Sequence, residues 1–397
     1  MSYNTRAVQI GGFDHVEAVM VGGGYPVVIQ TMWKDRLSFS DLEGKAGEAL
    51  VARIGGLKGM GCGLLRFAVP DTEAAEVLGR LAGMVSMPLV ADIHFDYRIA
   101  LRCMDFPVAK IRINPGNIGG REKVGAVLSR ASEKGIPVRI GVNAGSLPPD
   151  LRKKVEAGTD RALALAAAAE RELAVFREFG FRNILVSMKA SSVADTIRAN
   201  RILAEKNSGE RPAGNPADDA GPGNDGAGPP LHVGVTEAGP LVAGVVRNTA
   251  ALLRLLENGI GDTIRVSLSD TMENEVIAGR EILAAAAESA AAAGNAPGAA
   301  RLRRRGVTIV SCPRCGRNGF DTHGFTERWL DKLYGLDKNI TVAIMGCVVN
   351  GPGEARHADI GITGAGDRVL IFRHGKALRS VSADEADRAF TEELDRI

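Results

Sequence analysis

Three cysteines in the last quarter of the chain have the spacing of metal ligands. Cys312 and Cys315 form a Cys-x-x-Cys pair at the end of an apolar, β-branched run, and Cys347 ends the next such run. Because the ends of adjacent strands can meet at one edge of a sheet, three sulfur atoms can reach one point. Cys62 and Cys103 lie among apolar residues and are expected in a core. We therefore expect a metal centre with three thiolate ligands.

The fourth ligand decides which metal this centre would hold. A structural zinc of the Cys3His type could take an imidazole from His323 or His357. An iron–sulfur cluster normally takes four thiolates, but Glu354 follows Cys347 on a loop rich in Gly and Pro that can turn back toward a metal. A carboxylate is harder than a thiolate and exchanges more readily, which would open one iron to substrate. From spacing alone, zinc and iron–sulfur both remain open.

Five strand-like runs each carry one cation between apolar neighbours. In a strand, successive side chains alternate between two faces, so the cations would face the opposite way from their neighbours. Buried Lys and Arg are almost always paired, and Asp92, Glu237 or Asp262 could neutralise some of them. Five that converge would instead bind a polyanion, for which diphosphate is the obvious candidate. The five are Arg66, Arg112, Arg139, Lys189 and Arg265.

Further polar side chains follow the ends of the same runs. They are Asp92, His94, Asn114, Asn143, Glu237 and Ser267. A carboxyl in a partly desolvated mouth can have a raised pKa and donate a proton, which makes Glu237 a candidate general acid. The alternative is that Glu237 only complements a helix N-terminus. His94, next to Asp92 in a loop, is a candidate site residue.

Short β-branched runs alternate with longer helical patterns in the first part of the chain. This alternation is typical of parallel βαβ units, and eight of them that close on themselves make an α/β fold of the (βα)8 TIM-barrel type. Barrel enzymes keep their chemistry at the carboxyl ends of the strands. An open, doubly wound sheet is the competing architecture. The eight runs span residues 27–32, 64–69, 88–93, 108–113, 137–142, 183–189, 231–236 and 262–268.

The alternation breaks at two places. Residues 207–230 are rich in Gly, Pro, Asn and Asp and predict a flexible surface insertion. Residues 286–305 run from an Ala-rich stretch into a basic segment, 301–305, and predict the end of the last helix followed by an interdomain linker whose basic end is solvated. Strand and helix patterns beyond it predict a small α+β domain. We expect a substrate-binding barrel over 1–285 and a metal domain over 306–397.

The composition is that of a globular protein. The 397 residues are 45% hydrophobic and 24% charged, and a net charge of +2 gives no global field that would attract nucleic acid. The N-terminus has no apolar signal segment, and the low-polarity stretch 283–293 is too short to span a bilayer. We expect a cytoplasmic protein with reduced thiols, no nucleic-acid partner and no membrane contact. A metal-stabilised module that binds RNA through residues 301–305 is the non-catalytic alternative.

Several longer strings resemble one enzyme family over nearly the whole chain. They are VADIHFDYRIAL (90–101), RINPGNIG (112–119), RIGVNAGSL (139–147), VTEAG (235–239), GIGDTIRVSL (259–268), SCPRCGR (311–317) and GCVVNGPGEA (346–355). These strings resemble 4-hydroxy-3-methylbut-2-enyl diphosphate synthases of the bacterial two-domain type, which are iron–sulfur enzymes of the non-mevalonate isoprenoid pathway. One segment, Thr31-Met32-Trp33, departs from the family: the chain has Gln-Thr-Met-Trp where Gln-Ser-Met-Thr is usual, so Thr31 and Trp33 differ. That departure puts the contact of the first strand with substrate in doubt.

The resemblance implies an oxidoreductase that opens the ring of 2-C-methyl-D-erythritol 2,4-cyclodiphosphate. Single electrons from ferredoxin or flavodoxin would arrive through a 4Fe-4S cluster, and a hydroxyl would leave as water. A head-to-tail homodimer, in which one subunit's cluster caps the other's barrel, is also implied. The implied cluster ligands are Cys312, Cys315, Cys347 and Glu354. The implied diphosphate ligands are Arg66, His94, Arg112, Arg139, Asn143, Lys189, Arg265 and Ser267. The catalytic group would comprise Glu237, which assists proton delivery, Asn350 near the cluster, Asp92 and Glu354.

Overall fold

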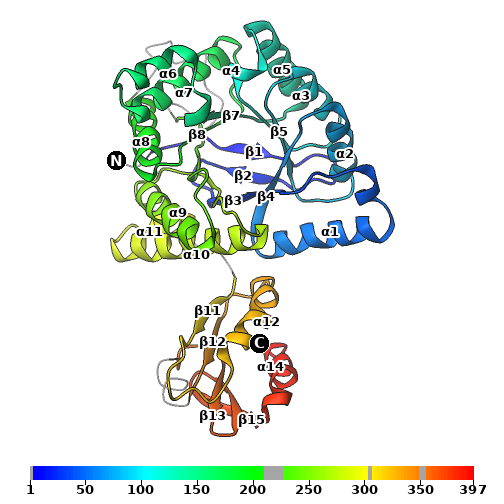
Figure 1. Cartoon of the computed structure of the whole chain (residues 1–397), viewed down its shortest axis with the longest axis vertical. Coiled ribbons are helices and arrows are strands. Elements are labelled where there is room, and N and C mark those ends of the chain that lie inside the picture. The colour runs from blue at the N-terminus through cyan, green and yellow to red at the C-terminus, as the bar shows by residue number, and fades with distance from the viewer. Residues whose placement is uncertain (1–2, 210–226, 303–305, 348–354) are drawn as a thin grey trace. The chain divides into compact units, whose positions relative to one another are not determined.

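The computed structural model describes residues 3–209, 227–302, 306–347 and 355–397 (Figure 1). The chain divides into two compact units, Met1–Arg304 and Arg305–Ile397. Each unit has its own sheet and its own buried core, and each is described here by itself.

The first unit is built around an eight-stranded parallel sheet (Figure 1). Its strands pair in the order β8-β7-β6-β5-β4-β3-β10-β9. A parallel bridge between Val186 of β8 and Leu231, directly before β9, brings the two ends of the sheet together. The sheet is therefore a closed barrel, which confirms the expected TIM-barrel fold over the open, doubly wound sheet. The strands are β3 (Val28–Met32), β4 (Cys62–Ala68), β5 (Leu89–Ile93), β6 (Lys110–Ile113), β7 (Val138–Asn143), β8 (Ile184–Lys189), β9 (His232–Val233) and β10 (Thr263–Ile264).

Helices follow the strands and cover the outside of the barrel. Several begin where a side chain caps the first turn: Asp71, Asp96, Asp160 and Thr271 each accept a hydrogen bond from a backbone N–H. No helix among the described residues is long and apolar enough to cross a membrane. The main helices are α1 (Gly44–Gly59), α2 (Thr72–Ala82), α3 (Tyr97–Cys103), α5 (Arg121–Lys134), α7 (Arg161–Glu178), α8 (Val193–Gly209), α9 (Leu241–Leu256) and α10 (Met272–Ala292), with α4 (Pro115–Ile118) and α6 (Pro149–Glu156) between them.

An N-terminal hairpin that the sequence did not predict covers one end of the barrel. Strands β1 (Val8–Ile10) and β2 (Val19–Val21) pair antiparallel. Their apolar side chains belong to one buried cluster with Val28, Leu64 and Val90, which lie near the starts of barrel strands. Strands of three residues are too short for an alternating pattern to be recognised. The hairpin lies at the end opposite the carboxyl ends of the strands.

Much of the expected linker is helical. Helix α10 extends to Ala292, and α11 spans Ala296–Leu302. Arg301 contacts Asp262 at 2.5 Å, and its side chain is only 15% exposed against 0% for Asp262. The prediction that the basic segment begins in solvent was therefore wrong for Arg301, because the buried Asp262 carboxylate requires a cation. Residues 303–305 lie outside the described residues.

The other expected insertion is described only at its two ends. Helix α8 continues to Gly209, so the first residues of the 207–230 segment are helical. Gly228 forms a parallel bridge with Thr5 near the N-terminus. Residues 210–226 lie outside the described residues.

The second unit is a five-stranded mixed sheet with two helices packed against it (Figure 1). Rings of Phe325, Trp329 and Phe390 join the two helices, with centroids 5.0–5.5 Å apart. Strand β15 was not predicted, because it is an exposed edge strand whose sequence carries charges instead of an apolar face. The elements are β11 (Thr308–Ser311), α12 (Thr322–Tyr334), β12 (Thr341–Met345), β13 (Ile360–Ala365), β14 (Arg368–Arg373), β15 (Lys376–Val381) and α14 (Ala386–Leu394).

The buried pair of Arg301 and Asp262 generates a stability prediction. Replacing Arg301 with Ala leaves a buried carboxylate without its cation, and we expect the free energy of unfolding to fall by about 3–5 kcal/mol. The same replacement at Arg254, exposed on α9, should change it by less than about 0.5 kcal/mol. Urea unfolding followed by circular dichroism measures both. Equal stability of the two variants would show that Asp262 does not depend on Arg301.

Candidate active site

The cations expected in the barrel lie at neighbouring strand positions. The register places Asp92 of β5 opposite Arg112 of β6, and Arg112 opposite Arg139 of β7. Lys189 of β8 lies opposite Asn143 at the end of β7. Residues opposite one another in a sheet point to the same face. Asp92, Arg112 and Arg139 therefore form one layer of side chains inside the barrel, and all three are buried.

Asp92 is shared by two of the arginines. Its Oδ1 accepts a hydrogen bond from Arg112 Nη1 at 2.9 Å, and its Oδ2 lies 3.6 Å from Arg66 Nε. Burial alone would raise the pKa of Asp92, but the nearby Arg66, His94 and Arg112 hold that pKa well below its usual range. Asp92 is consequently ionised at neutral pH. This environment suits a fixed charge that orients cations, and it does not suit a proton donor.

His94 adds a ring nitrogen to the same cluster. Arg112 Nη1 lies 2.8 Å from His94 Nε2. A guanidinium can only donate, so Nε2 is the acceptor in this contact. The His94 side chain is 43% exposed, which leaves it accessible to a ligand above the layer of buried charges.

The arginines in the barrel have donors that the described residues leave unsatisfied. The Nε atoms of Arg112, Arg139 and Arg265 are buried and have no hydrogen-bond partner there. Burial lowers the pKa of Arg139 well below its ordinary value, and repulsion from Arg66 and Arg112 lowers it further. Buried donors without partners are costly. A bound anion would satisfy them and offset the repulsion.

A buried histidine that the sequence analysis missed supports Lys189. Lys189 Nζ lies 2.9 Å from His232 Nε2, and His232 Nδ1 lies 2.7 Å from Thr263 Oγ1. Burial, followed by repulsion from Lys189, lowers the pKa of His232 well below its usual value. His232 is therefore neutral and accepts a hydrogen bond from Lys189.

Lys110 was missed in the same way. It is fully buried and donates to Gln30 Oε1 at 3.0 Å. The signal that identified the five cations, a polar residue between apolar neighbours in a strand, would also have identified Lys110 and His232.

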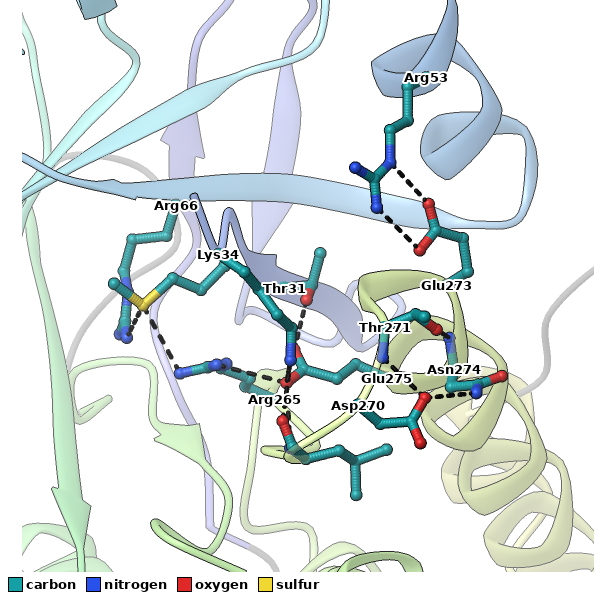
Figure 2. A network of polar contacts seen from close by, with 12 residues as sticks. Thr31, Lys34, Arg53, Arg66, Arg265, Asp270, Thr271, Glu273, Asn274 and Glu275 are labelled. Carbon is teal, nitrogen blue, oxygen red and sulfur yellow. Dashed lines mark hydrogen bonds and ion pairs between the residues drawn. The ribbon is translucent and has the colours of Figure 1, made fainter. Parts of the chain in front are cut away.

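A second buried carboxylate, Glu275 of α10, faces the cations from the rim of the barrel. It lies 3.4 Å from Arg265 Nη2, and Figure 2 shows it among several donors. In the sequence it resembles any acidic residue in the first turn of a helix, so nothing distinguished it. The sequence suggested that Asp262 could neutralise some of the five barrel cations. It pairs instead with Arg301.

Glu237 lies in the loop after β9. Its φ of 52° is in the left-handed region, which side chains other than glycine rarely adopt. Such conformations are concentrated at functional sites. Its side chain is exposed, so the described residues do not provide the partial desolvation expected for a general acid. Asn143 and Ser267, at the ends of their strands, are half-buried.

The departure from the family pattern at Trp33 lies outside the lumen. The Trp33 ring is buried and stacks on Phe67 at 5.6 Å, with Arg53 of α1 lying 5.2 Å from its centroid. Met32, the preceding residue, is the one that faces the cations: its sulfur accepts a hydrogen bond from Arg66 Nη2 at 2.7 Å and lies 3.7 Å from Arg265 Nη1. The first strand therefore keeps its contact with the cation cluster.

In the second unit, the cysteines lie beyond one edge of the sheet. Strands β11 and β12 are parallel, with Ser311 opposite Ile344. Cys312 directly follows β11, and Cys347 lies two positions after the end of β12. The Cys-x-x-Cys loop turns back because Arg314 adopts a φ of 73° and the Asn318 amide donates to the Cys315 carbonyl. Cys312 and Cys347 therefore follow strands that end at the same edge of the sheet.

Glycines hold this loop against the end of β12. The Gly319 amide donates to the Gly346 carbonyl at 2.8 Å. A Cβ on Gly364 would lie 2.7 Å from the Gly319 backbone and 2.8 Å from the Gly346 oxygen, so no larger residue fits there. The close approach places Cys315 and Cys347 on adjoining turns of the chain.

The thiols of this unit suit an iron–sulfur centre and zinc alike, and the described residues complete neither ligand set. All five cysteines are outside disulfides, and soft thiolates suit such a cluster. No three His, Cys, Asp or Glu side chains in the described part of the chain are close enough to hold a metal ion. His323, a possible zinc ligand, is exposed on α12 beside Glu327. Glu354 and Asn350 lie outside the described residues.

The neutral state of His232 generates a pH prediction. An unfolded histidine has a pKa of about 6.5, and the native pKa of His232 is lower. As pH falls below about 6.5, the unfolded chain therefore takes up a proton that the native chain does not, and stability is lost. The free energy of unfolding, measured from about pH 7.5 to 5.5, should fall less steeply in His232→Gln than in the wild type. The two slopes should differ by at most about 1.4 kcal/mol per pH unit. An unchanged slope in His232→Gln would contradict the prediction.

Known proteins share both units of this chain. The GcpE TIM-barrel domain matches residues 5–280, and the GcpE protein C-terminal domain matches residues 308–396. A protein of Treponema pallidum is 48% identical, with 99% of this chain and 92% of that protein covered. Relatives in Treponema denticola (46% identity, 98% and 97% covered) and Geobacter sulfurreducens (39% identity, 99% and 98% covered) are similar over the same extent. All three are named 4-hydroxy-3-methylbut-2-en-1-yl diphosphate synthase (flavodoxin). This chain belongs to the GcpE family.

Proposed function

We propose that this chain is a 4-hydroxy-3-methylbut-2-enyl diphosphate synthase. It converts 2-C-methyl-D-erythritol 2,4-cyclodiphosphate by reductive ring opening and loss of water, which supplies isoprenoid precursors. The observation that carries this proposal is the charge of the barrel interior, where three arginine Nε atoms have no partner among the described residues. Relatives that bear the name match the chain over 98–99% of its length.

The barrel residues have the chemistry of a diphosphate site. Arg112 and Arg139 offer planar guanidinium groups that can bind phosphate oxygens in a bidentate way. Arg66, Lys189 and Arg265 add charge from neighbouring strands. His94, Asn143 and Ser267 supply further hydrogen-bonding groups at or beyond the carboxyl ends of the strands. Asp92 keeps Arg66 and Arg112 in place through its two oxygens, so it is a positioning group for the arginines.

Cys312, Cys315, Cys347 and Glu354 would hold a 4Fe-4S cluster. When bound, the cluster supplies single electrons to the reduction. Three thiols beyond one sheet edge support this assignment, and Asn350 lies close to Glu354 in sequence. The names of the relatives favour flavodoxin as electron donor, with ferredoxin as the alternative.

Glu237 would deliver the proton that the departing hydroxyl requires. Its exposed carboxyl on a strained loop after β9 is accessible from outside the barrel. A head-to-tail homodimer, in which the cluster unit of one subunit covers the barrel of its partner, would remove water from Glu237 and supply the missing desolvation.

The shared carboxylate Asp92 provides one test. Changing Asp92 to Asn leaves two arginines without their counter-charge, so we expect the free energy of unfolding to fall by about 3–5 kcal/mol. Inorganic pyrophosphate should restore more stability to this variant than to the wild type, since the anion replaces the lost charge. Asp96→Asn, on the loop after β5, is the control, because Asn caps a helix as well as Asp. Thermal melts with and without pyrophosphate decide; a variant as stable as the control would remove Asp92 from this role.

A second test asks whether the barrel binds the substrate and the second unit binds the iron. Arg139→Met should retain cluster iron but raise the KM for the cyclodiphosphate by roughly a hundredfold, because a buried charge-assisted contact is lost. Cys347→Ser should lose iron and turnover while it still binds pyrophosphate. Iron, zinc and acid-labile sulfide are measured on anaerobically purified protein, and turnover is measured with a chemical one-electron reductant. Arg130→Met, on the surface of α5, is the matched control. One zinc per chain without iron or sulfide would contradict the cluster.

A further inference from the structure

Glu275 is the meeting point of a hydrogen-bond network at the rim of the barrel. Its side chain is 1% exposed. Its Oε1 accepts from Lys34 Nζ at 2.9 Å and from the Leu268 amide at 3.0 Å, and its Oε2 accepts from Thr31 Oγ1 at 2.5 Å. Arg265 Nη2 lies 3.4 Å from Oε1. Figure 2 shows donors from the end of β3 and from the segment after β10 directed at this one carboxylate.

The same network anchors the segment that contains Ser267. Lys34 Nζ also donates to the Leu268 carbonyl at 2.8 Å. Both backbone polar groups of Leu268 are therefore held, one by Glu275 and one by Lys34. Ser267, a proposed diphosphate ligand, directly precedes this fixed point, and α10 begins four residues after Leu268. The position of Ser267 therefore depends, through Leu268, on the Glu275 carboxylate.

Arg265 receives its orientation from two contacts. Glu275 holds Nη2 from one side, and the Met32 sulfur lies 3.7 Å from Nη1. The same sulfur accepts a hydrogen bond from Arg66 Nη2. The Arg265 Nε atom is buried and has no partner among the described residues. One face of the guanidinium is thus fixed by protein, while a buried donor remains for a ligand.

We propose that Glu275 is a positioning residue for the anion site. It directs Arg265 and the Ser267 segment at the diphosphate, although it does not itself contact the substrate. This inference rests on the proposed function, because it assigns a task within the diphosphate site.

A simple counter-charge would behave in the opposite way. If Glu275 only neutralised the cations, it would repel a bound diphosphate, and loss of its charge would strengthen anion binding. If it positions Arg265, loss of its charge releases Arg265 and Lys34, and anion binding weakens. The sign of the change in affinity therefore separates the two roles.

The chain offers a matched control two residues away. Glu273 lies in the same first turn of α10 and pairs with Arg53 of α1 at 3.0 Å. Arg53 in turn lies over the Trp33 ring, outside the lumen. Glu273→Gln removes the same charge from the same helix turn and leaves Arg265 with its partner.

The test compares Glu275→Gln with Glu273→Gln in the full chain. Gln keeps the shape of the side chain and can still accept from Leu268. Calorimetric titration with inorganic pyrophosphate should show binding weakened about tenfold in Glu275→Gln. The KM for the cyclodiphosphate should rise by a similar factor, while kcat changes less. Glu273→Gln should stay within about twofold of wild type in all three quantities. Unchanged or tighter pyrophosphate binding in Glu275→Gln would overturn the proposal.

A milder variant covers the case in which Glu275→Gln does not fold. Thr31→Val preserves shape and removes one hydrogen bond to Glu275, so pyrophosphate binding should weaken about threefold; wild-type affinity would overturn the proposal. Where Glu275→Gln folds, adding Thr31→Val should have little further effect, because both changes act through one carboxylate. Wild-type protein that neither binds pyrophosphate nor turns over the cyclodiphosphate would overturn the proposed function, and this inference with it. If the wild-type protein turns over the cyclodiphosphate and Glu275→Gln binds pyrophosphate as tightly as the wild type, the role of Glu275 is overturned while the proposed function stands.

Discussion

Mutual repulsion among buried cations is the constraint on which this structure depends. One closed barrel brings together five cations, of which Arg112, Arg139 and Lys189 are buried and Arg66 and Arg265 half-buried, and burial adds to the cost of their charges. The fold offsets this cost with a few ion pairs and does not neutralise every cation. Asp92 serves Arg66 and Arg112, and Glu275 serves Arg265. The remaining positive charge and the unsatisfied Nε donors are what make the interior receptive to a polyanion.

Neutral groups extend this arrangement deeper into the barrel. His232 accepts from Lys189, and Gln30 accepts from Lys110. A neutral acceptor satisfies the lysine donor and adds no negative charge that would repel a diphosphate. The hairpin of β1 and β2 covers the other end of the barrel with apolar side chains. The layer of charges therefore lies between the carboxyl ends of the strands and an apolar cluster at the other end of the barrel.

The second unit solves a different problem, which is to bring thiols from separate segments to one edge. Parallel pairing of β11 with β12 sends Cys312 and Cys347 in the same direction. The glycine contacts among Gly319, Gly346 and Gly364 let the backbones approach closely enough for the Cys-x-x-Cys loop to fold against that edge. The proposed redox site and the proposed anion site thus lie on separate sheets.

The sequence by itself determined the eight barrel strands, the two-unit organisation and the five cations, because strand alternation and βα periodicity are local signals. It also identified the cysteines and, through the longer strings, the family. Partners distant in sequence could not be found that way. Arg301 and Asp262 are 39 positions apart and Thr31 and Glu275 are 244 positions apart. Only the tertiary fold brings each pair together, and for Thr31 and Glu275 it does so through closure of the barrel between β3 and β10. The same closure decided that Trp33 packs against α1 and Met32 faces the arginines, since a side chain's face depends on register and not on residue type.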